Sequence, residues 1–415
     1  MASDGVPRRV VIVGAGHGGF QVAASLRQQG FDGDVVLLGD EPHLPYQRPP
    51  LSKDYLDGKT GLDLLVMRPE KFFADQRIEL IGGRPVAEID RAGKAVLLST
   101  KARIDYDHLV LATGARNRVP PLPGIELDGV CYLRNLAETD ALKERLAAAQ
   151  HCVVVGAGFI GLEFAAVARA AGKPVHIVEL TERVMSRVVC PDTSAFFADA
   201  HRAAGVEFSF GVRVERIGGA GGRLTHVVLD DGRNLPADLV LISIGVVPNE
   251  ELAAAAGLAV ENGIAVDDHL LTADPAISAI GDCASFPSRH SLRNPVRLEA
   301  VQNATDHARC VAARLVGKPE PYAALPWFWS EQGPLRLQIA GLTAGYQQVV
   351  LRGAPASGAY SAFCYAGDRL LGIESINNPA EHAFARRVLA ARRSIAPEQA
   401  ADRGFDLRAA AATRN

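Results

Sequence analysis

Two stretches of the chain share one order of apolar and polar positions. The first reads RRVVIVGAGHGGFQVAASLRQQG, in which a β-branched run at Val10–Val13 precedes a glycine-rich turn and a helix predicted to end near Gly30. A second apolar run, DVVLLGDE, follows this helix. Later in the chain, HCVVVGAGFIGLEFAAVARAAGKPVHIVEL repeats the order of strand, turn, helix and strand. Short apolar strands that alternate with helices in this way predict an α/β fold with parallel sheets.

Each turn carries glycines at the G-x-G-x-x-G spacing. The first glycine of this motif permits a tight turn, the second lets the backbone approach a pyrophosphate, and the third lets the helix pack closely on the strand. The N-terminus of the helix then offers unpaired N–H groups and a positive dipole end to the phosphates. One match is weak evidence, but two matches within the same order of elements predict two Rossmann-like dinucleotide-binding domains. The glycines are Gly14, Gly16 and Gly19 in the first turn and Gly156, Gly158 and Gly161 in the second.

An acidic residue at the end of the second strand of such a unit accepts hydrogen bonds from the adenosine ribose. In the first unit Asp40 is the best candidate, with Glu41 as an alternative. In the second unit the acid is Glu179, whose carboxylate would bind a free 2′-hydroxyl and repel a 2′-phosphate. Arg183 lies four residues further on and could soften this repulsion. We therefore predict that the second site takes NADH rather than NADPH.

Apolar runs continue beyond these two units. One buried strand ends at residues 112–114 and another ends at Gly245, each before a proline-containing crossover. Near residue 280 a short strand ends at residues 281–282, where the aspartate is well placed to bind a polyol hydroxyl. Residues 335–376 alternate as several strands, and a helix is predicted at 380–393. Because no third glycine motif occurs, this last part is predicted to be a separate α/β domain.

Composition narrows the classes of function. The 415 residues are 48% hydrophobic and 22% charged, with a net charge of −3 and a pI near 6.4, which gives no basic field to hold nucleic acid. The basic and then apolar N-terminal region has the outline of a secretory signal, yet it carries Gly14, Gly16 and Gly19 at the dinucleotide spacing and leads directly into a charged loop and a second strand. In addition, no run in the chain reaches the ~20 apolar residues of a membrane span. Six scattered cysteines without a C-x-x-C pair are typical of reduced cytosolic proteins. We expect a cytoplasmic protein with neither a nucleic-acid nor a membrane partner, and no metal site, because the histidines are isolated.

The stretch LPYQRPPLSKDYL, residues 44–56, combines two basic side chains, Arg48 and Lys53, with the proline pair at positions 49–50. The prolines fix φ and stiffen the approach to a helix start. The LDGKTG sequence that follows fails as a phosphate loop, because position 53 is lysine where that motif requires glycine. Taken alone, Lys53 would be a solvated lysine in the first turn after the prolines.

The order of G-x-G-x-x-G, RPPLSK, ATG, a second G-x-G-x-x-G, GVVPN and GDCA resembles that of the glutathione-reductase-like flavoprotein reductases with two dinucleotide-binding domains. Within these, RPPLSKDYL, YLRNLAETDAL, GFIGLEFAA and PWFWSEQ look most like the putidaredoxin reductase type. Members of that type are FAD-containing, NADH-dependent ferredoxin reductases that serve haem-thiolate monooxygenases and aromatic-ring dioxygenases. The resemblance covers nearly the whole chain.

The resemblance implies three domains, namely a discontinuous FAD-binding domain of residues 1–114 and 247–325, an NAD-binding domain of residues 115–246, and a C-terminal α/β interface domain of residues 326–415. The FAD contacts that it implies are Gly14, Gly16, Gly18, Gly19, Asp40, Arg48, Lys53, Val86, Ala112, Thr113, Arg134, Asp282 and Val301. The NADH contacts that it implies are Gly156, Gly158, Ile160, Gly161, Glu163, Glu179 and Gly245.

The resemblance also implies that Lys53 and Glu163 are the catalytic residues. Glu163 would stand beside the nicotinamide within reach of Lys53, and Lys53 would place positive charge near the flavin where the reduced ring becomes anionic. Without the resemblance, Glu163 would be a carboxylate near a helix N-terminus, stabilised by the dipole by about 0.3–1 kcal/mol.

The electron acceptor follows from a missing cysteine. Disulfide-reducing flavoproteins carry a redox pair beside the flavin, and peroxidase and coenzyme-A-disulfide relatives keep one cysteine in the loop near position 43. Here that loop reads EPHLPYQRPP, so the electrons are expected to leave for an external carrier such as an acidic 2Fe–2S ferredoxin, bound transiently. The alternatives are a reductase of rubredoxin, quinone or oxygen, or a signalling or nucleic-acid-associated flavoprotein like the apoptosis-inducing factors, which the pI disfavours.

Two features are candidates for the electron exit and partner surface. By resemblance, Trp327 and Trp329 in PWFWSEQ lie near the flavin edge, although packing of large rings explains them equally well. The predicted C-terminal helix carries a basic cluster that could attract an acidic ferredoxin, although a solvated helix face is the commoner explanation. This cluster comprises Arg386, Arg387, Arg392 and Arg393.

Overall fold

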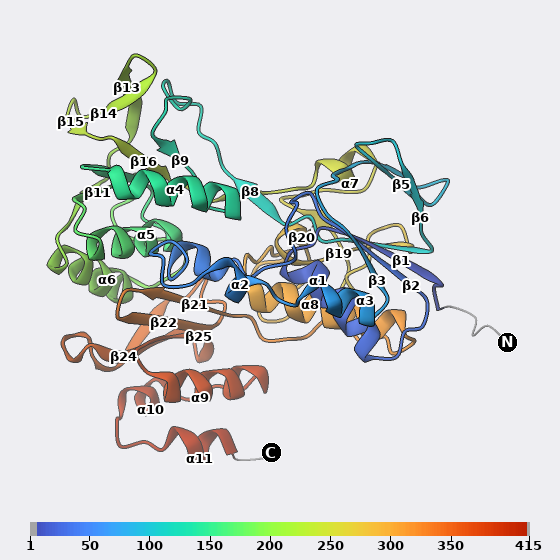
Figure 1. Cartoon of the computed structure of the whole chain (residues 1–415). Helices are drawn as coiled ribbons and strands as arrows, with labels where there is room; N and C mark the ends of the chain where they lie inside the picture. The colour runs from blue at the N-terminus through green and yellow to red at the C-terminus, as the bar shows by residue number, and fades with distance from the viewer. Residues whose placement is uncertain (1–5, 413–415) are drawn as a thin grey trace. The chain divides into compact units, whose positions relative to one another are not determined.

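The computed structural model describes residues 6–412, which divide into two compact units (Figure 1). Unit 1 contains the residues up to 47, residues 62–116 and residues 247–326. Unit 2 contains residues 48–61, 117–246 and the chain from 327 onward. The segment 48–61, which the resemblance places in the FAD-binding domain, therefore clusters with unit 2. The three-domain division itself stays a prediction.

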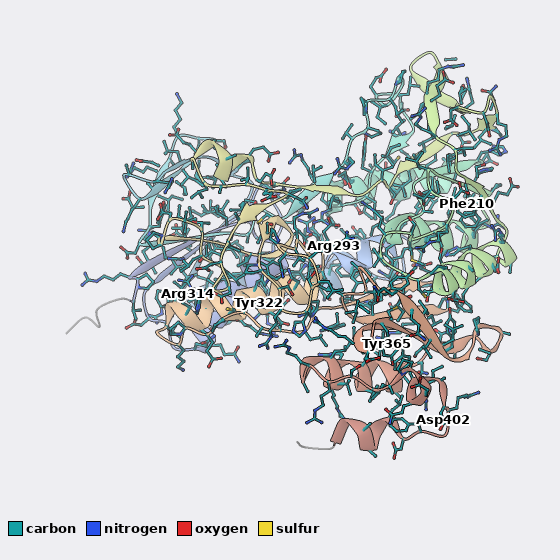
Figure 2. The ribbon with its side chains drawn as sticks, turned by 180° about the vertical axis from the view of Figure 1, so that it is seen from behind. Phe210, Arg293, Arg314, Tyr322, Tyr365 and Asp402 are labelled. Carbon is teal, nitrogen blue, oxygen red and sulfur yellow. The ribbon has the colours of Figure 1, made fainter. Side chains whose placement is uncertain are left out.

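Unit 1 is built on a five-stranded parallel sheet in the order β19-β7-β1-β2-β3. The helices α1 and α8 pack side by side on one face of it (Figure 1). Figure 2 labels Arg314 on α8 and Tyr322 just beyond that helix. The bounds are β1 Arg9–Val13, α1 His17–Gln28, β2 Asp34–Leu38, β3 Ile78–Ile81, β7 His108–Leu111, β19 Ile277–Ala279 and α8 Val301–Leu315.

The alternation of side chains along β1 explains the layers of unit 1. Val10 and Ile12 are fully buried in the core shared with α1 and α8. Val11 and Val13 face the opposite core, which includes a three-stranded antiparallel sheet, β4-β5-β6. The smaller elements of unit 1 are α2 Leu62–Leu65, α3 Glu70–Asp75, β4 Val86–Asp90, β5 Ala95–Leu98, β6 Arg103–Asp105, α7 Glu251–Ala255, β18 Ile264–Ala265, η2 Gly281–Cys283 and β20 Ala284–Ser285.

The first part of unit 2 repeats this plan. A five-stranded parallel sheet in the order β12-β11-β10-β16-β9 packs on one side against helices and on the other against the antiparallel sheet β13-β14-β15. Its elements are η1 Pro49–Ser52, β9 Val130–Cys131, α4 Leu136–Ala148, β10 Cys152–Val155, α5 Phe159–Ala170, β11 Val175–Glu179, α6 Pro191–Ala203, β12 Val206–Phe210, β13 Val214–Ala220, β14 Arg223–Leu229, β15 Asn234–Pro236 and β16 Leu239–Ile242. The strands β8 Ala115–Asn117 and β17 Val246–Pro248 lie where the chain passes from one unit to the other.

The C-terminal part of unit 2 is an antiparallel sheet in the order β21-β22-β25-β24-β23, followed by helices. The helix predicted at 380–393 is wrong at its end, because α9 stops at Ala390 and Arg392 adopts a left-handed backbone with φ 53°. The elements are β21 Trp327–Gln332, β22 Leu335–Gly341, β23 Gln348–Ala354, η3 Pro355–Ser357, β24 Ala359–Ala366, β25 Arg369–Ile376, α9 Pro379–Ala390, α10 Pro397–Ala401 and α11 Leu407–Ala412. Two parallel sheets with crossover helices and a C-terminal α/β part confirm the predicted fold class.

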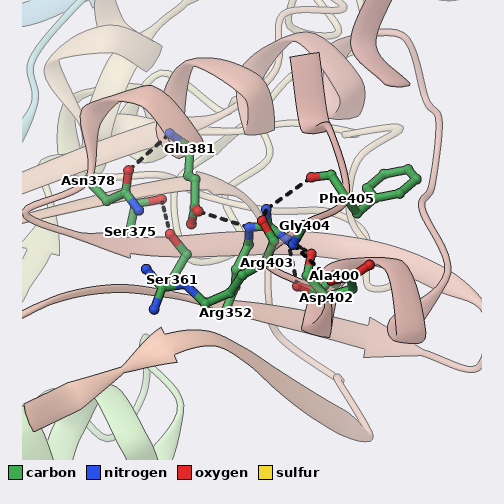
Figure 3. A network of polar contacts seen from close by, with 10 residues as sticks. All are labelled: Arg352, Ser361, Ser375, Asn378, Glu381, Ala400, Asp402, Arg403, Gly404 and Phe405. Carbon is green, nitrogen blue, oxygen red and sulfur yellow. Dashed lines mark hydrogen bonds and ion pairs between the residues drawn. The ribbon is translucent and has the colours of Figure 1, made fainter. Parts of the chain in front are cut away.

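Arg352 on β23 connects residues 400–405 to this sheet by hydrogen bonds (Figure 3). Its side chain is 8% exposed, and its Nε donates to Glu381 Oε1 of α9 at 3.0 Å. Nη1 donates to the carbonyls of Ala400 and Asp402, and Nη2 donates to the carbonyls of Arg403 and Phe405. One buried guanidinium thus donates to four carbonyls at and after the end of α10.

Candidate functional site

The first glycine turn requires glycine at two of its three motif positions. Gly14 has φ 110°, and a Cβ there would lie 2.1 Å from the Ala112 carbonyl oxygen. A Cβ at Gly19 would lie 1.8 Å from the Gly14 carbonyl oxygen, so α1 packs on its strand only with glycine at this position. A Cβ at Gly16, in contrast, would have no described atom within 4 Å. The backbone is open on that side, as the approach of a pyrophosphate requires.

The second turn has the same geometry in unit 2. Gly156 has φ 103° and a Cβ there would meet the Ser243 carbonyl oxygen at 2.4 Å, while a Cβ at Gly161 would meet the Gly156 carbonyl oxygen at the same distance. Gly158 again faces open space within the described part of the chain. No described side chain forms a capping hydrogen bond at the start of α1 or α5. The N-terminus of a helix directs N–H groups and a positive dipole end toward a phosphate. These two cradles fit the pyrophosphates of two dinucleotides.

Asp40, the acid that follows β2, is adjacent to Glu41, whose carboxylate already accepts a hydrogen bond from another side chain of the protein. Asp40 is exposed, directly after the strand and its following glycine. Glu41 accepts a hydrogen bond from the Tyr46 hydroxyl at 2.5 Å. This engagement of Glu41 favours Asp40 as the ribose ligand.

Glu179, at the end of β11, is fixed against the second glycine turn. Its Oε2 accepts from the Ala157 N–H at 2.7 Å, and its Oε1 accepts from the N–H and the hydroxyl of Thr181 at 2.9 and 2.8 Å. Arg183 donates from Nη1 to the Val189 carbonyl and from Nη2 to the Ser186 carbonyl, both at 2.8 Å. Since the Arg183 guanidinium is committed to these carbonyls, it does not supply the cation that a 2′-phosphate would need.

Lys53 and Glu163 form a buried ion pair within unit 2. The two prolines of η1 stand at the start of that short helix, and Lys53 follows its last residue. Lys53 Nζ lies 2.8 Å from Glu163 Oε2, and the side chains are 17% and 4% exposed. Lys53 also donates to the Pro49 carbonyl at 3.2 Å. The interpretation of Lys53 as a solvated lysine is therefore wrong, and the reach from Glu163 to Lys53 that the resemblance implies is present.

Two serines, which the sequence did not single out, complete the coordination of Glu163. Ser52 donates to Oε2 at 2.5 Å, and Ser330 of β21 donates to Oε1 at 2.7 Å. Gln332 Nε2 donates in turn to the Ser330 hydroxyl at 3.3 Å, and its Oε1 accepts from His201 Nε2 at 2.8 Å. Burying a carboxylate is costly unless donors surround it, and Glu163 has three of them.

The strand β21 carries Ser330 on one face and the tryptophans on the other. Phe328, two residues before Ser330, packs on Phe159 of α5 with ring centroids 4.6 Å apart. Trp327 and Trp329 are half-buried with centroids 5.6 Å apart. The guanidinium of Arg386 on α9 lies 4.5 Å from the centroid of the Trp327 ring. The structure thus gives the tryptophans a packing role, and their part in electron exit stays a prediction.

The basic cluster of the C-terminal region is split by the end of α9. Arg386 and Arg387 are exposed on the helix, while Arg392 and Arg393 follow it. Arg392 is exposed and Arg393 is half-buried. The use of these residues in partner docking also stays a prediction.

His307 on α8 holds the loop that carries Asp282. Its Nδ1 accepts from the Gly281 N–H at 3.2 Å, and its ring packs edge-on against Phe286 and Tyr322. The side chain is 0% exposed, and burial lowers the pKa of His307 to about 3. A neutral imidazole therefore supports the start of η2 at neutral pH.

The remaining predicted contacts are distributed over both units. In unit 1, Thr113 donates from its hydroxyl to the Asn249 carbonyl at 2.6 Å, and Asn249 Nδ2 donates back to the Thr113 carbonyl at 2.8 Å. In unit 2, Arg48 Nη1 donates to the Arg134 carbonyl at 2.8 Å. The others are Gly18 in α1, Val86 at the start of β4, Ala112 directly after β7, Val301 at the start of α8, Ile160 in α5 and Gly245 before β17.

Two features are absent from residues 6–412, namely a cluster of metal-binding side chains and a helix that could cross a membrane. No group of three or more His, Cys, Asp or Glu side chains there is arranged to hold a metal ion. None of the helices in the same range combines the length and the apolar character needed to cross a membrane.

Comparison with known proteins gives matches along almost the whole chain. Residues 8–308 match the pyridine nucleotide-disulphide oxidoreductase family, and residues 327–411 match the reductase C-terminal family. The chain is 50% identical to rhodocoxin reductase of Rhodococcus erythropolis over 403 residues, which cover 97% of this chain and 94% of the relative.

Two solved structures are similar over their full length. The ferredoxin reductase for the CYP199A2 system from Rhodopseudomonas palustris has a TM-score of 0.95 at 56% identity, covering 98% of this chain and 100% of that one. Putidaredoxin reductase in its covalent complex with putidaredoxin has a TM-score of 0.95 at 40% identity, covering 98% and 99%.

Proposed function

The chain belongs to the pyridine nucleotide-disulphide oxidoreductase family, as its motifs predicted, and from this premise we propose that it is an FAD-dependent NADH:ferredoxin oxidoreductase. It takes electrons from NADH and passes them singly to a 2Fe–2S ferredoxin that supplies a monooxygenase or a dioxygenase. FAD, when bound, provides the chemistry that converts the two-electron donor into a one-electron source.

The observation that carries this proposal is the buried Lys53–Glu163 pair in a segment without a cysteine. A thiol-dependent reductase of this family would need sulfur beside the flavin, and neither the loop near position 43 nor residues 48–61 contain a cysteine. The segment instead supplies a cation, held rigidly by η1 and by the Glu163 carboxylate. A fixed cation of this kind stabilises negative charge that develops on a bound ring system without reorganising during the reaction.

The protein's other contributions are binding and orientation. The open sides of Gly16 and Gly158 and the uncapped ends of α1 and α5 are suited to the pyrophosphates of FAD and NADH, respectively. Glu179 selects NADH, because its fixed carboxylate binds a 2′-hydroxyl and repels a 2′-phosphate while Arg183 is engaged elsewhere. Lys53 and Glu163 act as the catalytic residues, and Ser52 and Ser330 position Glu163.

The partner is an acidic ferredoxin in a transient complex, and the compartment in which the two meet is the cytoplasm. The names of rhodocoxin reductase and of the solved ferredoxin reductase support a small redox protein as the acceptor. The basic residues Arg386, Arg387 and Arg392, all exposed, offer charge that complements such a partner.

The test is anaerobic reduction of the purified holoenzyme by NADH, followed by titration with 2Fe–2S ferredoxins while the reduction of cytochrome c is monitored. We expect cytochrome reduction that depends on both the enzyme and a ferredoxin. Equal or faster electron transfer to rubredoxin, a quinone or oxygen would contradict the proposed acceptor. An equal or better kcat/KM for NADPH would contradict the proposed donor.

A further inference from the structure

Two cysteines that are far apart in the sequence share one buried cluster in unit 2. Cys190 directly precedes α6, and Cys364 lies on β24 of the C-terminal sheet. Both side chains are 0% exposed, as is Glu374 on the neighbouring strand β25. The cluster thus joins the helix layer of the nucleotide-binding part to the C-terminal sheet.

Glu374 contacts both cysteines. Its Oε1 and Oε2 accept from the Cys190 N–H at 2.9 and 3.2 Å, and Cys364 Sγ lies 3.9 Å from the same Oε1. The strand register explains this arrangement. Glu374 is opposite Ala362 and therefore on the same face as Cys364, whose own opposite residue is Gly372, without a side chain.

Cys190 has the surroundings of a reactive thiol. It stands at the N-terminus of the thirteen-residue helix α6, and its Sγ lies 3.4 Å from the Thr193 hydroxyl. A hydrogen bond from Cys364 is the main cause that lowers the pKa of Cys190 to about 6, and Thr193 adds to this effect against the opposing effect of burial. Cys364 and Glu374 have raised pKa values, the former through its bond to Cys190 and the latter through burial. Two thiols in one buried cluster, one of them at a helix N-terminus, can act as a nucleophilic and a resolving cysteine.

We propose that Cys190 and Cys364 form a reversible disulfide when the protein meets hydrogen peroxide. The Cys190 sulfur attacks one peroxide oxygen, the O–O bond breaks, and one water leaves to give a sulfenic acid. The Cys364 sulfur then attacks the Cys190 sulfur, the S–O bond breaks, and the second water leaves. Two thiols and one peroxide thus give one disulfide and two waters, the two thiol protons ending in water. A dithiol reductant restores the thiols by supplying two electrons and two protons.

Exposed residues flank Cys190 in the sequence. The buried Cys190 is followed by the exposed Pro191, and Val188, two residues before it, is 42% exposed. The resulting bond would fasten the start of α6 to β24 and close a long loop between positions 190 and 364, which restricts the unfolded chain.

The experiment treats the reduced holoenzyme with hydrogen peroxide, quenches it with acid and alkylates the remaining thiols. Trypsin releases Cys190 and Cys364 in separate peptides, residues 188–202 and 353–369, and each peptide contains a single cysteine. We expect these two peptides to appear as one cross-linked species that dithiothreitol separates. Free thiols should fall from six to four, and the oxidised protein should unfold at a higher denaturant concentration than the reduced one.

Three variants make the assignment specific. Cys190→Ser and Cys364→Ser should each abolish the cross-link, whereas Cys152→Ser, a buried cysteine on β10, should leave it intact. Absence of the cross-link from the folded protein would refute the proposal, as would its formation only after denaturation. Pairing of Cys190 with a cysteine other than Cys364 would refute it as well.

Discussion

Replacing Lys53 with methionine removes the cation from the Lys53–Glu163 pair while keeping a side chain of similar length. The Glu163 carboxylate, 4% exposed, then retains only Ser52 and Ser330 as donors. Breaking a buried ion pair by removing one partner costs about 3–5 kcal/mol, and the two serine bonds place this case near the lower end, at about 3 kcal/mol. The loss of a fixed charge at a reacting ring costs about 10²–10³-fold in rate.

The opposite change, Glu163→Gln, should destabilise the protein less than Lys53→Met does. Lys53 is 17% exposed and also donates to the Pro49 carbonyl, so its ammonium keeps partial hydration and one acceptor. We expect a cost of about 1.5–3 kcal/mol, the range for a hydrogen bond to a charged group. The loss of stability in the double variant should be smaller than the sum of the losses in the two single variants. Each single variant leaves one unpaired charge, and the double variant leaves none.

The measurements are the rate of flavin bleaching by NADH in a stopped-flow instrument and the midpoint of chemical unfolding of the holoenzyme. Lys59→Met is the matched control, because Lys59 lies in the same segment with a side chain that is 73% exposed. The control should behave as wild type in both assays. Two results would refute the reasoning, namely a Lys53→Met enzyme that reduces its flavin as fast as the control, or a Glu163→Gln enzyme less stable than Lys53→Met.

Three further predictions concern positions away from this pair. The pKa of His307 is about 3 in the folded protein and ~6.5 in the unfolded chain, so acidification from pH 8 to 5 should remove about 2 kcal/mol of stability through this group. The variant His307→Asn should therefore show a weaker dependence of the unfolding midpoint on pH over that range. Glu179→Gln should lower the ratio of kcat/KM for NADH over NADPH by about tenfold or more, since the charge that repels a 2′-phosphate is gone; an unchanged ratio would contradict the role of Glu179. Arg352→Met should leave four carbonyls without their donor, so limited trypsin digestion should cleave at Arg403 much faster than in an Arg369→Met control.

The parts of the structure that the sequence predicts well are those set by local geometry. The glycine turns could be recognised because two of the three glycines in each turn face a carbonyl oxygen at distances that exclude any Cβ, so the requirement is visible in the residues themselves. The parallel strands could be recognised because burial on both faces demands continuous apolar runs. The end of α9 was missed because it depends on a left-handed residue, Arg392, where the sequence has no glycine to mark it.

The parts that the sequence hides depend on contacts between distant residues. Ser52 and Ser330 approach Glu163 from two other segments, and their short polar side chains carry no pattern of their own. The cysteine pair is hidden in the same way, because Cys190 and Cys364 meet only when α6 packs against the C-terminal sheet. The one available signal was the adjacency of Ser52 to Lys53 in RPPLSK, which places a hydroxyl at the end of the same short helix.

The side chains of β21 alternate between its two faces. One face contacts the Lys53–Glu163 pair, and the other carries the tryptophans of the predicted electron exit. Its even-numbered residues, Phe328, Ser330 and Gln332, contact α5 and α6, so this face holds the Glu163 carboxylate. Its odd-numbered residues include both tryptophans, which lie on the other face with Arg386 of α9 over the Trp327 ring. A shift of the strand by one residue would exchange these faces and remove the Ser330 bond together with the tryptophan packing. Selection that retains the Glu163 site therefore also retains the orientation of the tryptophans, whether or not electrons pass through them. Substitution of Trp329 alone, with flavin reduction by NADH unchanged and ferredoxin reduction slowed, is the pattern that would separate an exit role from packing.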